Sequence, residues 1–313
     1  MPLLFAIAVL MMGNRIAFAL ALVALMLGVD GWAKVSQSIK PGVLTRSFFG
    51  IYAVTDNARG DRTLVHGTTI HGIQNRGSDA RERMPTSYYA PLSGVGLAMQ
   101  AAPALFGPAA RIDVVGLGAG TLACYAKPGQ SWRMYEIDPA IVAIARDPAR
   151  FSFLSKCLPA VPVVVGDARL MLAQAEAGGA DMLVVDAFSS DSVPMHLLTK
   201  EAFATYQRRL APGGVLMIHI SNRYLALEPV LAAAAKDGWS AKIREYEASP
   251  AARNDNMSSS NWVALTRDPT TLDKLVAQQP AQKWRPIVAR DGFVGWSDDY
   301  GSILPIIKFR YVN

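Results

Sequence analysis

The residues best suited to chemistry are a glycine triplet and the acid that follows it. Gly116, Gly118 and Gly120 come directly after an apolar stretch, and Glu136 ends the next apolar stretch. Glycines after a first strand let the backbone approach a ligand, and an acid ending the second strand can accept hydrogen bonds from two ribose hydroxyls. A dinucleotide fingerprint needs glycine where this chain has Thr121. The compact pattern therefore favours a nucleoside ligand such as S-adenosylmethionine, although glycines alone predict only a tight turn.

Two further acids follow apolar stretches in the same way. Asp167 follows 161–165 and Asp186 follows 182–185. A carboxylate at Asp167 can accept a hydrogen bond from an adenine amino group. A partly desolvated carboxylate at Asp186 can take a proton from an ammonium nucleophile. In the loop after Asp186, Asp191 either holds a second positive group or is simply solvated, and the sequence leaves both readings open.

Aromatic and imidazole side chains are candidates for the substrate side. Tyr88 and Tyr89 precede a predicted helix, where they either line a substrate entrance or pack in the core. His66 and His71 are each followed by glycine and are candidate ligand contacts. A single histidine in a strand is more often structural, so we do not assign either one a catalytic role.

These residues need a scaffold that brings them to one edge, and the chain predicts one. Apolar segments alternate with helical segments from residue 91 onward, which predicts a doubly wound, mostly parallel α/β sheet. Ligands bind at the carboxyl ends of the strands in such sheets. The predicted strands are 112–115, 132–135, 161–165, 182–185 and 215–220, and the predicted helices are 91–102, 139–146, 170–174 and 199–210.

Residues 41–90 differ in composition from the rest of the chain, with short β-branched and aromatic runs at 47–55, 62–66 and 69–74. Glycines separate these runs, which predicts a small antiparallel sheet. The expected organisation is a hydrophobic segment and linker at 1–40, a β-rich domain at 41–90 and a nucleoside-binding catalytic domain at 91–313.

The stretch 2–29 is almost wholly apolar and is interrupted by Gly13, Asn14 and Arg15. One spanning helix needs about 20 apolar residues, and a lone arginine at its centre would cost roughly 2.5–3.5 kcal/mol. Two short helices around a turn fit better, and membrane attachment is our prediction. A signal peptide and a buried or amphipathic helix are the alternatives.

Charge and cysteine content bear on partners and location. The net charge is +6 but no basic run occurs, so an anionic membrane explains the charge at least as well as nucleic acid, which we do not expect as a partner. Lys34, Lys40 and Arg46 favour a catalytic domain on the cytoplasmic side of a bacterial inner membrane. Cys124 and Cys157 are interpreted as buried thiols in a reducing compartment. Neither they nor the four histidines have metal-site spacing, so no metal is expected.

Several motifs in order resemble spermidine synthases, the polyamine aminopropyltransferases, and most of all the bacterial branch fused to membrane segments. They are VVGLGAGTL, MYEIDPAIVAIAR, VVVGDARLML, LVVDAFSSDSVPMHLLTKEAF, RLAPGGVL, HGTTIHGIQ and WSDDYGSILPIIKF, and the similarity runs from about residue 46 to the C-terminus.

The resemblance implies a small N-terminal β domain on a Rossmann-like class I methyltransferase fold, a homodimer, and decarboxylated S-adenosylmethionine as cosubstrate. It implies that Glu136 binds ribose, Asp167 binds adenine and Asp186 deprotonates an amine such as putrescine. Further candidates on the substrate side are Gln74, Tyr88, Tyr89, Asp191, Asp298 and Asp299. The Asp298–Asp299 pair serves equally well at a helix N-terminus.

The departures from the family fall on the acceptor side. The acidic segment of the soluble synthases is replaced by TSYYAPLSG, and Asp191 follows Asp186 at a longer spacing. Two alternatives therefore remain beside aminopropyl transfer. One is methyl transfer from intact S-adenosylmethionine, and the other is a membrane-tethered nucleoside-binding module without catalysis.

Overall fold

The computed structural model describes residues 13–32, 35–36, 40, 42–67, 69–187 and 194–308. Its centre is an eight-stranded sheet in the order β12-β10-β11-β9-β8-β5-β6-β7. The strands from β9 to β7 are parallel, and β11, β10 and β12 continue the sheet in antiparallel pairings. The predicted mostly parallel α/β fold is confirmed. The strands are β5 (Arg111–Val115), β6 (Ser131–Glu136), β7 (Val163–Val165), β8 (Ala180–Val185), β9 (Leu210–His219), β10 (Ser240–Tyr246), β11 (Ser260–Thr266) and β12 (Arg285–Pro286).

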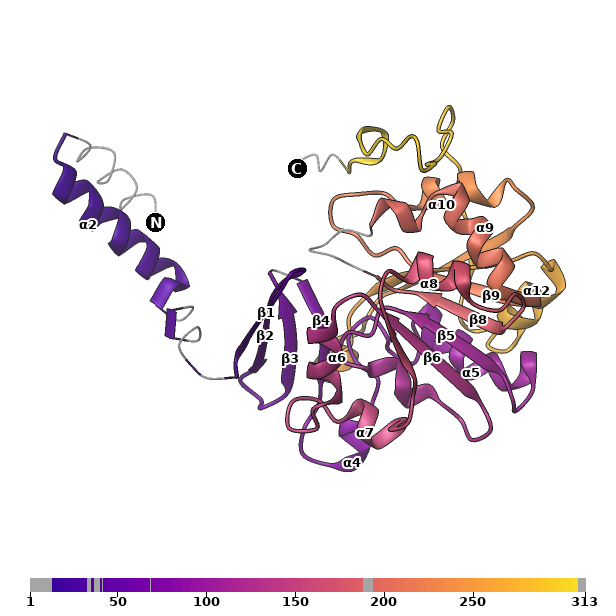
Figure 1. Ribbon diagram of the computed structural model, residues 1–313, viewed down its shortest axis with the longest axis horizontal. Coiled ribbons are helices and arrows are strands. Elements are labelled where there is room, and N and C mark those ends of the chain that lie inside the picture. Colours follow the sequence, from indigo (N-terminus) through magenta and orange to yellow (C-terminus); the bar gives the residue numbers. More distant parts are fainter. Residues whose placement is uncertain are drawn as a thin grey trace.

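Helices cover both faces of this sheet (Figure 1). Successive strand residues point to opposite faces, so Val184 packs into one apolar core and Val185 into the other. Helices contributing to the first core are α5 (Gly94–Phe106), α6 (Pro139–Arg146), α7 (Phe153–Cys157) and α12 (Pro269–Ala277). Those contributing to the second are α8 (Ala168–Gln174), α9 (Lys200–Arg209) and α10 (Glu228–Ala235). Burial of both faces explains the nearly continuous apolar strands.

The smaller sheet is antiparallel, as predicted, with strand order β1-β2-β3-β4. It packs against the glycine loop of the larger sheet. A Cβ atom at Gly72 would lie 2.6 Å from the Cβ of Ala119, so this contact has no room for a side chain. The strands are β1 (Leu44–Ser47), β2 (Gly50–Asp56), β3 (Arg62–His66) and β4 (Thr69–Gln74), and the short helix α4 (Asp79–Glu82) follows them.

Connecting segments contain short helical pieces. The segment after the glycine loop is a 3₁₀ turn, η2 (Thr121–Tyr125), and not a full α-helix. The predicted helix at 91–102 begins later, because the Ser93 side chain caps α5 by accepting from Gly96 N–H. The remaining pieces are η3 (Met195–Leu197), α11 (Pro250–Asn254) and η4 (Leu304–Ile306).

The N-terminal helix α2 (Arg15–Met26) lies apart from the two sheets (Figure 1). Asn14 caps it, and a π-helical turn, η1 (Leu27–Gly31), continues it. This agrees with the predicted turn at 13–15, while the predicted first helix lies outside the described residues. None of the helices in the described ranges is long and apolar enough to span a bilayer.

The interpretation of Cys124 and Cys157 as thiols is wrong, because a disulfide joins them. Their Cα atoms lie 4.9 Å apart, since η2 packs directly against α7. The sequence did not predict this disulfide, because the two cysteines are 33 residues apart and only the fold brings them together. The disulfide ties the turn after the glycine loop to the helix beside it.

Candidate active site

A pocket lies where the carboxyl ends of β5, β6 and β8 meet the smaller sheet. It holds about 890 Å³ of space not filled by protein atoms, its open mouth included. Its lining draws on both sheets and on the loops between them. Among the lining residues are Tyr52, His66, His71, Tyr88, Tyr89, Gly116, Gly118, Glu136, Asp167, Asp186 and His196.

The glycine loop forms one wall, and two of its glycines are needed for close approach. Gly116 has φ +93°, and a Cβ atom there would lie 2.2 Å from the carbonyl oxygen of Asp186. Gly118 has φ +52°, and its Cβ would lie 2.6 Å from the carbonyl oxygen of His71. Such φ values favour glycine, and neither position has room for a side chain. The glycine loop is therefore packed tightly between the end of β8 and the smaller sheet.

Glu136 lies beside this loop with its carboxylate held by the backbone. One oxygen accepts from Leu117 N–H at 3.0 Å and the other from Asp138 N–H at 3.0 Å. Burial raises the pKa of Glu136, and these backbone hydrogen bonds oppose that rise. Each carboxylate oxygen has a further lone pair to offer to a ligand hydroxyl. The geometry thus suits a ribose acceptor fixed against the glycine loop.

Asp167 caps helix α8 at the pocket rim. One of its oxygens accepts from Leu170 N–H at 3.1 Å, and the other lies 3.3 Å from Nε2 of His196. The carboxylate therefore has a local structural role and also lines the pocket. These two roles are compatible, because a carboxylate can accept about four hydrogen bonds.

Asp186 lies at the end of β8 and is 7% exposed. One oxygen accepts a hydrogen bond from the Tyr89 hydroxyl, and the other lies 2.7 Å from Nδ1 of His219. Burial and the nearby Asp186 charge raise the pKa of Tyr89 far above its usual value, so Tyr89 remains a neutral donor. Asp186 thus combines what a general base needs: access to the pocket, burial, and a fixed orientation.

Aromatic and imidazole rings form part of the pocket lining. The ring centroids of Tyr88 and Tyr89 are 4.4 Å apart, and those of His66 and His71 are 5.7 Å apart. Burial raises the pKa of Tyr88, and the Asp186 charge adds to the effect. All four side chains line the pocket. Aromatic faces attract organic cations, which suits an ammonium ligand.

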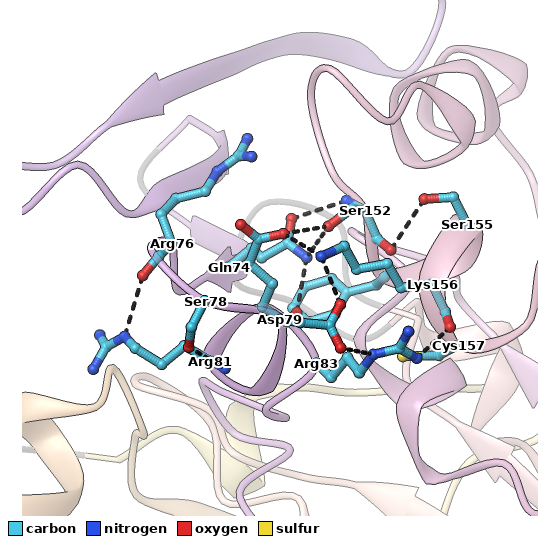
Figure 2. A network of polar contacts seen from close by, with 12 residues as sticks. Gln74, Arg76, Ser78, Asp79, Arg81, Arg83, Ser152, Ser155, Lys156 and Cys157 are labelled. Carbon is cyan, nitrogen blue, oxygen red and sulfur yellow. Dashed lines mark hydrogen bonds and ion pairs between the residues drawn. The ribbon is translucent and has the colours of Figure 1, made fainter.

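Gln74 does not reach the pocket. It is fully buried, its amide donates to Ser152 Oγ and Glu82 O, and its carbonyl oxygen accepts from Ser152 N–H. Figure 2 shows this amide within a polar network that joins β4, α4 and α7. The same network contains the ion pair between Lys156 and Asp79 at 2.8 Å. Gln74 therefore anchors the smaller sheet to the larger domain.

The structure also leaves the C-terminal acids outside the pocket. Asp298 pairs with Arg169 and accepts from the Thr199 hydroxyl at 2.8 Å, and Arg169 lowers its pKa to about 2. Asp299 is exposed at the surface. Asp191 lies outside the described residues. Of the candidates on the substrate side, the pocket contains Tyr88 and Tyr89.

The sequence analysis did not single out His219, whose Nδ1 lies 2.7 Å from the Asp186 carboxylate. His219 is the last residue of β9, next to β8 in the sheet. Ligand sites form at the carboxyl ends of parallel strands, so the position of His219 at the end of β9 is the signal that marks it. His196 and Tyr52 were not predicted, because they reach the pocket from η3 and from β2 of the smaller sheet and not from a strand end of the larger sheet.

Fold and pocket together define an α/β protein with a pocket at the carboxyl ends of its parallel strands and a buried carboxylate in the pocket lining. No known family model matches the chain. Two curated proteins are similar to part of it, and their names confirm the resemblance to the spermidine synthase family. A probable polyamine aminopropyl transferase of Bifidobacterium longum is 28% identical over 165 residues, which is 51% of this chain. A polyamine aminopropyltransferase of Vibrio vulnificus is 32% identical over 125 residues, which is 38% of this chain. The matches span only 33% and 40% of those relatives' own lengths.

Solved structures support the fold. A probable spermidine synthase from Corynebacterium glutamicum superposes with a TM-score of 0.58 at 15% identity, covering 80% of this chain and 96% of that one. A spermidine synthase from Thermotoga maritima gives a TM-score of 0.51 at 11% identity, covering 79% of each chain. At these identities the likeness establishes the shared fold alone.

Proposed function

We propose that this protein is an aminopropyltransferase that moves an aminopropyl group from decarboxylated S-adenosylmethionine to an amine. The observation that carries the proposal is the placement of Asp186 in the same pocket as the glycine loop and Glu136. The curated relatives named for this activity support it. In this arrangement, Glu136 holds the ribose, Asp167 meets the adenine, and Asp186 faces the incoming amine.

The reaction needs orientation and one proton acceptor. The incoming ammonium gives one proton to Asp186, which frees the nitrogen lone pair. That lone pair attacks the propyl carbon next to the sulfonium, and the carbon–sulfur bond breaks with its electron pair returning to sulfur. The products are methylthioadenosine and the aminopropylated amine in its protonated form, and Asp186 releases its proton to water. Holding both reactants in line supplies much of the acceleration, because the sulfonium is a good leaving group.

The discriminating experiment incubates the protein with decarboxylated or intact S-adenosylmethionine and a panel of amines. Mass spectrometry then identifies the product. We expect a gain of one aminopropyl group with the decarboxylated donor. Transfer of a methyl group from the intact donor would replace this proposal with methyl transfer.

The role of Asp186 is tested by Asp186→Asn. Removing a general base lowers rates by about 10²–10⁴-fold, so we expect a loss of kcat in that range. Donor binding, measured by calorimetry, stays near the wild-type value, because the glycine loop and Glu136 are untouched. Equal turnover by the variant would refute the assignment of the base, and absence of turnover by both proteins would favour a nucleoside-binding module.

We further propose that the N-terminal segment attaches the protein to a membrane. None of the α2 residues is buried, and Ile16, Leu20 and Met26 are 75%, 64% and 70% exposed. An apolar helix of this kind binds lipid through its exposed side chains. Full-length protein should sediment with vesicles containing anionic lipid, and Leu20→Glu with Met26→Glu should abolish this. The matched pair Val294→Glu and Leu304→Glu, at apolar residues outside α2 that are 83% and 72% exposed, should leave it unchanged.

We also propose that the catalytic domain lies on the cytoplasmic side of the membrane. Lys40 and Arg46 support the cytoplasmic side, whereas the disulfide between Cys124 and Cys157 is typical of an oxidising compartment. Thiol labelling of protein taken directly from cells tests this. Free thiols in intact cells support the cytoplasmic side, and a full disulfide supports the opposite side.

The resemblance also supports the proposal of a homodimer. Light scattering on the detergent-solubilised protein measures the mass of the assembly. A mass of one chain would refute it.

A further inference from the structure

A chain of hydrogen bonds ends on the carboxylate of Asp186. It begins at the backbone of β11 and passes through Ser221 and His219. We propose that His219 is the positioning residue that orients the reacting carboxylate, with Ser221 supporting the imidazole tautomer that donates to it. This inference rests on the proposed role of Asp186 as the base.

The hydrogen bonds assign the protons along this chain. The Asp186 carboxylate only accepts hydrogen bonds, so the proton of the neutral imidazole lies on Nδ1 and Nε2 is an acceptor. Nε2 then accepts from the Ser221 hydroxyl at 2.7 Å, and Ser221 Oγ in turn accepts from Asn261 N–H at 2.8 Å. Nδ1–H donates to Asp186 across 2.7 Å.

Stacking holds the imidazole plane. The ring centroid of His219 lies 4.6 Å from that of Tyr88 and 4.6 Å from that of Trp262, with interplanar angles of 26° and 16°. Trp262 is directly opposite His219 in the pairing of β9 with β11, and its Nε1–H donates to the Tyr88 carbonyl at 3.1 Å. The ring therefore has one orientation in which Nδ1 reaches Asp186.

His219 acts through Asp186 and not on the substrate. It is 3% exposed, and the pocket lining contains Asp186 but not His219. Hydrogen bonds to a carboxylate favour its charged form, which is the form that accepts a proton. With Tyr89 donating to the second oxygen, both carboxylate oxygens are fixed in direction. The remaining lone pairs are thus available to the incoming ammonium.

Kinetic variants test this role. His219→Leu removes the donor, whereas His219→Asn places an amide N–H near the position of Nδ1. We expect His219→Leu to lower kcat by at least about 10-fold, as for other residues that orient a reacting group, with the donor KM unchanged. His219→Asn should recover a substantial part of this loss.

A milder variant covers the case in which changes at His219 prevent folding. Ser221→Ala keeps the ring but removes the hydroxyl that fixes its tautomer, so we expect a several-fold loss of kcat. Ser155→Ala makes the same chemical change at an exposed site on α7 and should leave kcat unchanged. If His219→Leu and Ser221→Ala both keep wild-type kcat while Asp186→Asn loses it, the positioning role is refuted and the base remains.

A second readout does not depend on activity. Long-range ¹H–¹⁵N spectra of the labelled protein distinguish the two imidazole tautomers, and the His219→Asn spectrum assigns the signal. We expect the Nδ1–H form in the wild type and a mixture in Ser221→Ala. A wild-type Nε2–H form would overturn the inference. If the wild type transfers no aminopropyl group, the proposed function fails and the positioning role fails with it, whereas the tautomer result stands.

Discussion

The two halves of the pocket are built in different ways. The half proposed to hold the donor, called the donor half, consists of the glycine loop, Glu136 and Asp167, and backbone N–H groups hold both carboxylates: Leu117 and Asp138 for Glu136, and Leu170 for Asp167. The base half consists of Asp186, Tyr89 and His219, which come from separate segments and hold one another through side chains. A backbone-built half tolerates changes in distant sequence. A side-chain-built half can change its specificity by single substitutions, which agrees with the family departures on the acceptor side.

The largest effect on this comparison is expected at Gly116, a residue of the donor half that lies directly against Asp186 of the base half. Gly116→Ala introduces a Cβ atom 2.2 Å from the Asp186 carbonyl oxygen at a φ of +93°. Displacing the loop by about 1 Å misplaces both reactants, so we expect kcat/KM to fall by at least about 100-fold. The melting temperature should fall as well.

Gly178→Ala is the matched control for that change. Gly178 has φ +65°, and a Cβ atom there would meet nothing within 4 Å. Gly178→Ala therefore has the cost of placing an alanine at positive φ, roughly 1–2 kcal/mol, but no steric clash of the new Cβ atom. Equal kinetic losses in both variants would show that the close approach of Gly116 to Asp186 is unimportant.

The disulfide between Cys124 and Cys157 tests the donor half separately, because η2, which contains Cys124, directly follows the glycine loop. Cys124→Ser with Cys157→Ser opens a link across 33 residues, which we expect to lower the free energy of unfolding by about 2–4 kcal/mol. Thermal unfolding measures this, and dithiothreitol should not destabilise the double variant further. The imidazole tautomer of His219 should be unchanged. A change in it would mean that the two halves are coupled through the core.

Glu136→Gln tests the donor half alone. Hydrogen bonds to a charged group contribute about 1.5–3 kcal/mol, so we expect the donor KM to rise by roughly 10- to 100-fold. The kcat at saturating donor should change little, because Asp186 is untouched. Calorimetric titration with methylthioadenosine checks the binding directly. A loss confined to kcat would place Glu136 on the reacting side instead.

The smallest effect is expected at Asp298, which belongs to neither half. Asp298→Asn breaks a partly exposed ion pair with Arg169, so the free energy of unfolding should fall by less than about 1 kcal/mol. Because the folded pKa of Asp298 is lowered to about 2, this contribution is present above the unfolded pKa near 4 and is lost as pH falls toward 2. Denaturant titrations at several pH values check this, and a changed amine KM would return Asp298 to the substrate side.

The α/β scaffold and the contact between the glycine loop and Glu136 could be predicted from the amino-acid pattern. Apolar segments that alternate with helices require a covered parallel sheet, and the glycines and Glu136 sit where chain order alone brings them together. Both predictions depend on the order of residue types along short segments of the chain, which the sequence shows directly.

The roles of several other polar residues depend on how the chain packs, and the sequence did not reveal them. Gln74 and Asp298 have the polar side chains of ligand contacts, but packing directs them into structural networks. His219 and the cysteine pair gained their roles from neighbours that are distant in sequence. The physical reason is that hydrogen bonds and disulfides act over a few ångströms, and the sheet order that brings such partners together is not a property of any single segment.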